Sequence, residues 1–480
     1  MKPLVICAIV LLLVIAPLPS TRFARSGQAL ARGDTEYKID LTRYFSSAAG
    51  EAQSRATVLA DAKAFAASAT PLSAEALLKW LQRYDAILQS LERHDIYVYL
   101  RAEEDDRDTA DAKADDRLGA AEDLISNRVT EAARGLGAAH IARLTQQPAL
   151  RPYRYLLTRS LAQVVHRLTP SESRSVALAV TPVLDSAAST YKALRKSKDT
   201  IESDREAYAA LLVSIASARN GVARLRGFGS AADASYFDKE SRPVVGCARP
   251  RRGSRFERVR ALSCGRRERP KPGYTPPPIT ISDAIPLILA AEQPMGADYA
   301  GAYMQLLDPS MHRFELCSAA ECDDTGFSIG FSGLESGVFY GGYNGTTKTV
   351  RAVAHESGHA VHRQFMARHQ PIAAYNRGPA FMFESFAIFN ELLFLDHLYR
   401  TAADNAARAY YLKYFLDDAT FQVYGSAEET ELESAIYRGV DCLERRFLGI
   451  ELSDERTLLE NAAQVIDART QVLAALYSSK

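Results

Sequence analysis

The sequence has no surplus of charge of either sign, because 58 basic and 58 acidic side chains cancel over 480 residues. Such a chain has no overall electrostatic field that would attract a polyanion, so nucleic acid binding is not expected. Its hydrophobic content of 47% is that of an ordinary soluble globular protein. The length exceeds what one core requires and predicts two lobes or two domains.

The apolar run at the N-terminus is too short to cross a bilayer comfortably. It covers residues 4–16, whereas a spanning helix needs about 20 apolar residues. Lys2 precedes this run and Ala29-Leu30-Ala31 offers a small-residue cleavage pattern after it, as in a secretory signal peptide. We therefore predict a signal peptide over residues 1–31, with a cut nearer Ser20 as the alternative. The mature protein is expected to be exported, periplasmic or extracellular, without a stable membrane span.

Cysteine is scarce, with six residues, of which five would remain after cleavage. An odd number leaves at least one thiol unpaired in an exported protein. Cys317 and Cys322 lie close in sequence, and either a disulfide or two small buried hydrophobic residues would account for them. Metal binding through cysteine is not expected, because no second pair lies at ligand spacing.

Apolar residues recur at helical spacing through the N-terminal half, as in Leu77, Trp80, Leu81, Tyr84 and Leu88. We predict an N-terminal helical region over residues 32–240. The pattern then stops.

Residues 241–278 contain a stretch, 249–269, that shows neither helical nor strand periodicity. They contain nine arginines between positions 249 and 269 and then Pro276-Pro277-Pro278, a stiff connector. We interpret the segment as a linker or surface insert. Translation of 249–269 out of frame is the alternative.

A second structured region is predicted over residues 279–480. Helical patterning resumes there, and from Thr325 to Asn344 glycines separate Phe, Ile, Val and Tyr residues. Alternation of this kind is typical of short strands with bulges. A small sheet is therefore expected just before the next helix.

That next helix carries His355-Glu356-Ser357-Gly358-His359. Histidines at i and i+4 project from one helix face, where both imidazoles can bind one metal ion. Glu356 lies at the edge of that face and could act as a general base on water. A catalytic zinc site usually has three protein ligands and one open position, so a third ligand is required. His362 follows at i+7 and is assigned a supporting contact beside the ligands.

The third ligand is expected from a run that is apolar nearly all round, residues 381–394, which contains Glu384 and Glu391. A helix of this kind should be buried, and an isolated buried carboxylate needs a compensating cation. The two glutamates are seven residues apart and share a face. One can therefore bind the metal while the other orients a ligand imidazole.

These motifs resemble the thimet oligopeptidase and oligoendopeptidase F family of gluzincin zinc metallopeptidases. That family has HExGHxxH followed by a glutamate ligand 25 residues beyond the second histidine, which is the spacing of His359 and Glu384 here. Further similarity lies in Tyr343-Asn344-Gly345-Thr346 and in Phe389-Asn390-Glu391-Leu392-Leu393. The resemblance covers most of the chain up to about Glu433.

The resemblance implies a mainly helical, two-lobed enzyme with a small sheet beside the HExxH helix. It also implies one zinc ion per chain, held by His355, His359 and Glu384, and hydrolysis of short unstructured peptides with Glu356 as the base. The family has a deep channel that admits such peptides. The Gly-rich segment would line this channel, with Gly341, Gly342 and Tyr343 pairing with the peptide backbone.

The chain departs from the family pattern at its end. Family members continue to a segment with a histidine and tyrosines that stabilise the oxyanion, whereas here no histidine follows His397. Four tyrosines remain as candidates: Tyr410, Tyr411, Tyr414 and Tyr424. We therefore expect an apparently truncated catalytic region. A weakly active or inactive relative that binds zinc and peptides is the alternative to the active peptidase, because loss of one oxyanion donor costs about 100- to 1000-fold in rate. A helical scaffold without metal is the remaining hypothesis.

Overall fold

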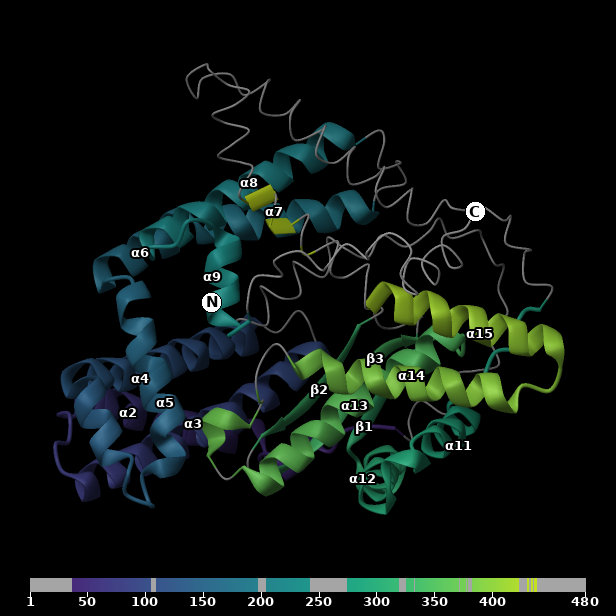
Figure 1. Cartoon of the computed structure of the whole chain (residues 1–480), viewed down its shortest axis with the longest axis horizontal. Helices are drawn as coiled ribbons and strands as arrows, with labels where there is room; N and C mark the ends of the chain where they lie inside the picture. Colours follow the sequence, from purple (N-terminus) through teal and green to yellow (C-terminus); the bar gives the residue numbers. More distant parts are fainter. Residues whose placement is uncertain are drawn as a thin grey trace, which may run out of the picture. The chain divides into compact units, whose positions relative to one another are not determined.

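The protein is mainly helical with one small sheet, as the sequence predicts (Figure 1). The computed structural model describes residues 37–104, 109–196, 204–241, 274–318, 325–331, 333–370, 372–376, 378, 382–422, 430, 433–434 and 436–437. The predicted signal peptide, the Arg-rich stretch at 249–269 and residues 438–480 lie outside these ranges. Among the described residues, no helix combines the length and apolar character needed to cross a bilayer.

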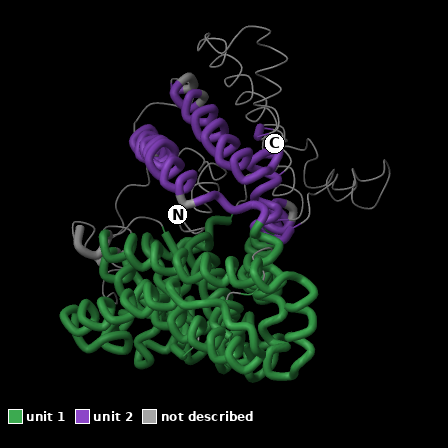
Figure 2. Tube along the Cα trace, turned by 90° about the vertical axis from the view of Figure 1, so that its left-hand side faces the viewer, with its two compact units in different colours: residues 1–5, 17–164, 274–412 green, residues 6–16, 165–273, 413–480 purple. Residues whose placement is uncertain are grey.

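Contacts divide the chain into two compact units (Figure 2). Of the described residues, the first unit contains 37–164 and 274–412, and the second contains 165–241 and 413–437. This division differs from the expected one. The helical region expected at 32–240 is shared between the two units, because its first part packs with the region after residue 274.

The N-terminal part of the first unit is a set of packed helices. Their bounds are η1 (Leu41–Arg43), α2 (Ala48–Ala66), α3 (Ala74–Glu104), α4 (Thr109–Leu144), η2 (Arg151–Tyr153) and α5 (Arg154–Gln163). Ser47 caps α2 by accepting a hydrogen bond from the backbone N–H of Gly50. The predicted apolar stripe of α3 is buried, and the indole ring of Trp80 stacks on Phe65 with ring centroids 4.6 Å apart.

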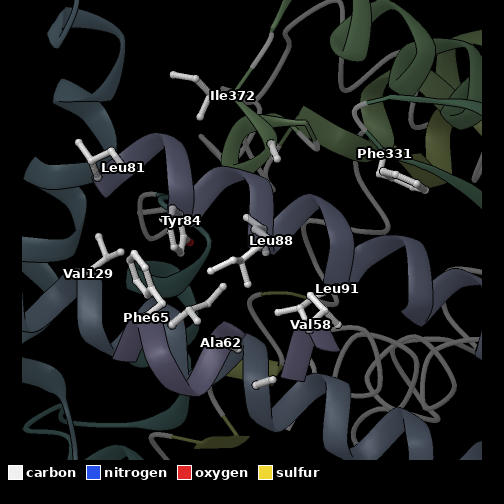
Figure 3. Close-up of a cluster of buried hydrophobic side chains, with 14 of the residues drawn as sticks. Val58, Ala62, Phe65, Leu81, Tyr84, Leu88, Leu91, Val129, Phe331 and Ile372 are labelled. Carbon is white, nitrogen blue, oxygen red and sulfur yellow. The ribbon is translucent and has the colours of Figure 1, made fainter. Parts of the chain in front are cut away.

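This helical core extends to residues far along the chain. Phe331 and Ile372 belong to the same buried cluster as Phe65 and Leu88 (Figure 3). The N-terminal helices and the second half of the first unit therefore share one core. Removing either part would expose the apolar face of the other.

The second unit contains η3 (Val164–His166), which begins at the boundary, then α6 (Pro170–Ala179), α7 (Thr181–Lys196), α8 (Arg205–Leu225) and α9 (Ala231–Asp238). Thr169 and Glu172 form a capping box at the start of α6. The buried side chain of Asn220 donates to the carbonyl of Tyr437, 2.7 Å away, so a distant segment is fixed on α8.

The rest of the first unit carries the sheet. Its elements are α11 (Ile281–Ala291), η4 (Gln293–Met295), α12 (Ala297–Leu307), η5 (Pro309–Met311), β1 (Phe314–Ser318), β2 (Gly326–Phe331), β3 (Leu334–Tyr343), α13 (Thr347–His369), η6 (Ala373–Tyr375), α14 (Phe383–Thr401) and α15 (Asn405–Thr420), which crosses into the second unit. The strand order is β1-β3-β2, with β1 parallel and β2 antiparallel to β3. Cys317 in β1 is disulfide-bonded; Cys322 lies outside the described residues.

The two outer edges of the sheet differ. Along β1, the backbone N–H of Leu316 donates to the carbonyl of Tyr37 at 3.3 Å, and the N–H of Ile39 donates to the carboxylate of Glu315 at 3.2 Å. Within the described residues, no strand pairs with the outer edge of β2. The edge open to a further strand is therefore that of β2.

Glu292, at the C-terminal end of α11, is a buried carboxyl group in this unit. Its side chain is 0% exposed, and neither carboxylate oxygen has a hydrogen-bond partner among the described residues. Burial raises the pKa of Glu292 to about 8. The folded protein therefore binds a proton here over a pH range in which the unfolded chain has released it.

We predict that Glu292→Gln makes the protein less sensitive to alkaline pH. Because the pKa of Glu292 is raised on folding, its contribution to stability is complete below the ordinary pKa and is lost as pH rises through about 8. In thermal melts, the Tm of Glu292→Gln relative to wild type should increase between pH 5 and pH 8.5. The exposed Glu75→Gln serves as control. An equal Tm difference at both pH values would contradict the prediction.

Candidate metal centre

The histidine helix α13 starts at a closely packed turn. Gly345 has φ +73°, and a Cβ atom there would lie 2.7 Å from the carbonyl oxygen of Ile279, so a larger residue would clash. Thr346 then caps the helix by accepting from the N–H of Thr349 at 3.4 Å. This start fixes the rotation of α13, which directs His355 and His359 toward α14.

His355, His359 and Glu384 converge as the sequence spacing predicts. Their candidate ligand atoms all lie within 4.8 Å of one another. The Nε2 atom of each histidine is 3.4 Å from Oε2 of Glu384. Tetrahedral zinc with bonds of about 2.0–2.1 Å requires ligand atoms about 3.3–3.4 Å apart, which both histidine–glutamate distances match. The donor set and these two distances fit a zinc ion.

The charges of this cluster favour a cation between the three side chains. Burial opposes ionisation of Glu384, but its contacts with the two histidines hold its pKa below the ordinary value. Burial likewise opposes protonation of His355, but the carboxylates of Glu384 and Glu391 raise its pKa to about 10. Burial lowers the pKa of His359. The carboxylate of Glu384 would stabilise either a proton or a metal ion placed between the three side chains. A divalent metal ion can bind the Nε2 atoms of both imidazoles at once.

Glu391 lies on the opposite nitrogen of His355. Its Oε1 is 2.5 Å from His355 Nδ1, and its Oε2 is 3.2 Å from the guanidinium of Arg351. A carboxylate in this position fixes the imidazole tautomer that leaves Nε2 free for a metal. The structure thus brings Glu391 to His355, a candidate ligand, as the sequence argument predicted.

His362 contacts aromatic rings. The ring of His362 stacks on that of Phe386, with centroids 3.7 Å apart. The ring of Phe383 contacts both histidines: it stacks on His359 at 4.2 Å and lies edge-on to His362 at 6.2 Å. Burial lowers the pKa of His362 to about 4, so the ring is neutral at physiological pH. A supporting role for His362 would therefore act through packing of Phe383 and Phe386.

Glu356 faces the start of β2. A Cβ atom on Gly326 would lie 3.0 Å from Cγ of Glu356 and 2.8 Å from the ring of Tyr340, so glycine is required where the strand passes the glutamate. Burial raises the pKa of Glu356 to about 7. A carboxylate with such a pKa can accept a proton near neutral pH and return it.

Two expectations from the sequence need correction. Glu384 was expected in a buried helix, but its side chain is 55% exposed, because the first turn of α14 is open and burial begins at Ala387. Gly341 and Gly342 were expected to pair with a peptide, but they lie in β3, the central strand.

Strand β3 is paired on both sides: Ser318 of β1 lies opposite Tyr343, and Gly326 of β2 lies opposite Tyr340. The N–H of Gly341 also donates to the carbonyl of Thr325 at 2.7 Å, on the β2 side. Glycine content alone did not distinguish a central strand from an edge strand.

The candidate oxyanion tyrosines have other partners. The rings of Tyr410 and Tyr411 lie 5.8 and 6.1 Å from that of Tyr274. Tyr414 lies in the part of α15 that belongs to the second unit. Tyr424 lies outside the described residues. None of these contacts assigns an oxyanion donor.

Comparison with solved structures identifies peptidases with the same fold. A provisionally assigned peptidase from Chlamydophila abortus matches with a TM-score of 0.60 and 19% identity, over 92% of this chain and 87% of that chain. A provisionally assigned oligoendopeptidase F from Bacillus anthracis matches with a TM-score of 0.52 and 13% identity, over 94% and 86%. PZ peptidase A with an inhibitor gives 0.50 and 14%, over 93% and 86%.

No family model matches the sequence, and no curated protein matches it. The structural likeness shows that the chain has the fold of oligoendopeptidase-type peptidases, which agrees with the resemblance in the sequence motifs. At these identities the likeness concerns the fold. Activity and ligands must be argued from the site itself.

The geometry predicts that His359→Ala weakens zinc binding by orders of magnitude, because two ligands remain where three converge. The purified protein should contain about one zinc per chain, measured by elemental analysis after dialysis against a weak chelator. His369→Ala, an exposed histidine on the same helix α13, serves as the matched control and should keep its zinc. Undiminished zinc in His359→Ala would show that the ligands lie elsewhere.

Proposed function

We propose that this chain is a zinc-dependent endopeptidase that hydrolyses short unstructured peptides. The observation that carries the proposal is the convergence of His355, His359 and Glu384, in which both histidine Nε2 atoms lie 3.4 Å from Oε2 of Glu384, with Glu356 on the histidine helix α13. The fold shared with oligoendopeptidase-type structures supports a peptide as substrate. Two imidazoles and one carboxylate leave a fourth ligand position for water or substrate.

A zinc ion bound there would supply Lewis acidity, polarising the scissile carbonyl and making water acidic enough to ionise near neutral pH. The residues of the chain supply the proton transfers and the orientation. Glu356 accepts the proton of the attacking water and returns it to the leaving amine, for which a pKa of about 7 is suitable. Glu391 holds His355 in place throughout, since its carboxylate is fixed between the imidazole and Arg351.

The outer edge of β2 is the position that best fits the peptide backbone. Thr325 and Gly341 form a hydrogen-bonded pair, and the register places Phe327 opposite Phe339 and Ile329 opposite Gly337. In an antiparallel pair the hydrogen-bonded positions alternate. The backbone groups of Gly326 and Ser328 therefore point away from β3, toward the free edge.

A peptide added to this edge would be held beside the base. Gly326 is the residue of β2 next to Glu356. Main-chain pairing gives affinity with weak dependence on side chains and requires an extended, unfolded substrate. The proposed substrate class follows from this geometry.

Glu356→Gln should separate hydrolysis from metal binding. The amide cannot accept the water's proton, so kcat is expected to fall by about 100- to 10,000-fold while zinc content stays unchanged. A quenched fluorescent peptide library and elemental analysis measure the two properties on the same preparation. The exposed Glu75→Gln should behave as wild type.

Two results would count against this assignment. Hydrolysis by Glu356→Gln at the wild-type rate would place the base elsewhere. Zinc and peptide binding by the wild type without chelator-sensitive cleavage would identify a peptide-binding relative that is not an enzyme.

Ser328→Pro tests the edge-strand model of substrate binding. Proline removes the outward N–H of residue 328 and is tolerated where an edge strand faces solvent. Loss of one backbone hydrogen bond should raise KM by about 2- to 10-fold with little change in kcat. Ser328→Ala is the control, because it loses only the side-chain bond from Arg363. An unchanged KM in a folded Ser328→Pro protein would exclude pairing at this position.

A further inference from the structure

Helix α12 places two tyrosines against the two helices of the metal centre. The hydroxyl of Tyr303, which is 0% exposed, donates to the carbonyl of Ala354 at 2.8 Å. Ala354 directly precedes His355. Tyr299, one helical turn earlier on α12, forms a hydrogen-bonded pair with the side chain of Asn390, with distances of 3.1 and 2.9 Å. Asn390 directly precedes Glu391, which holds His355.

The same asparagine lies where α13 packs closely on α14, at Gly358. A Cβ atom on Gly358 would lie 2.7 Å from Nδ2 of Asn390 and 3.1 Å from Cα of Ala387. Glycine is therefore required between the two histidine ligands, one residue before His359. Asn390 also donates to the carbonyl of Phe386, and this bond fixes the amide of Asn390 between α13 and α14.

Tyr299 and Tyr303 thus act on both ligand helices at once. One hydrogen bond constrains α13 at the residue next to the first histidine, and the other constrains α14 between its two functional glutamates. The rings of the two tyrosines lie 5.6 Å apart and belong to one rigid turn of α12. A shift of α13 relative to α14 would break at least one of these bonds.

We propose that Tyr299 and Tyr303 are positioning residues that set the spacing of α13 and α14, and with it the separation of the three metal ligands. The inference rests on the proposed function. Each hydroxyl bonds to a residue that directly precedes His355 or Glu391, so it acts through Ala354 or Asn390. Residues that orient metal ligands typically change metal affinity or activity by about 10- to 100-fold when they are altered.

The test is the zinc dissociation constant of Tyr303→Phe, Tyr299→Phe and the double variant, measured by competition with a chromogenic chelator. Each single variant should bind zinc about 10-fold more weakly or worse, and KM should stay within about twofold of wild type while kcat falls. Tyr84→Phe is the matched control, since Tyr84 is also buried and its hydroxyl contacts Ser126 in the N-terminal helices. Circular dichroism establishes that each variant is folded.

A further variant tests the approach of the two helices directly. Gly358→Ala should weaken zinc binding, because its methyl group would lie 2.7 Å from Nδ2 of Asn390 and 3.1 Å from Cα of Ala387. Wild-type zinc affinity in a folded Gly358→Ala protein would contradict the proposal that the spacing of α13 and α14 sets the separation of the ligands.

The possible outcomes are distinct. Wild-type zinc affinity in both folded tyrosine variants would overturn the positioning role while leaving the proposed function intact. Loss of affinity in Tyr84→Phe equal to that in Tyr303→Phe would show a nonspecific effect and would also overturn it. A wild-type protein that binds no zinc would refute the proposed function, and the positioning proposal with it.

Discussion

The close packing of α13 on α14 is the constraint on which the rest of the site depends. Each helix alone carries an incomplete site, because His355 and His359 lie on one and Glu384 on the other. Ligand atoms 3.4 Å apart require that the two helices lie near each other along this stretch. Glycine at position 358 permits that approach, and the buried polar contact of Asn390 makes it specific.

The N-terminal helices support this pair through the connection between them. Asp85 of α3 accepts from the backbone N–H of Ala373 at 2.6 Å, and Glu92 accepts from the side chain of Asn376 at 2.7 Å. Tyr375 in the same connection donates to the carbonyl of Pro152 at 3.0 Å. The chain between the second histidine and Glu384 is thus bound to helices that lie 223 to 288 residues earlier in the sequence. These contacts explain why the first unit combines two distant stretches of sequence.

Sequence reasoning was reliable where one local pattern determines the answer. Helical periodicity predicted α3, and the spacing of His355, His359 and Glu384 predicted which side chains converge. It failed where the answer depends on neighbours from elsewhere in the chain. Gly341 and Gly342 carry no signal that β3 is central, and the apolar run around Glu384 does not reveal that its first turn is open. Tyr303 gave no signal either, since a tyrosine on an apolar helix face usually belongs to a core.

The two glutamates of α14 show how burial assigns different roles to identical side chains seven residues apart. Glu384 is 55% exposed and touches both Nε2 atoms, so it can bind an ion that water and substrate also reach. Glu391 is 6% exposed, and its negative charge is paired with both Arg351 and His355. A buried carboxylate with two cationic or polar partners gains little by binding a third, whereas Glu384 faces both Nε2 atoms and water, so a metal ion can reach its oxygen and both imidazoles together. A metal ion is therefore favoured at Nε2 of His355, on the side of Glu384. The hydrogen bond from Nδ1 to Glu391 makes that imidazole a stronger ligand.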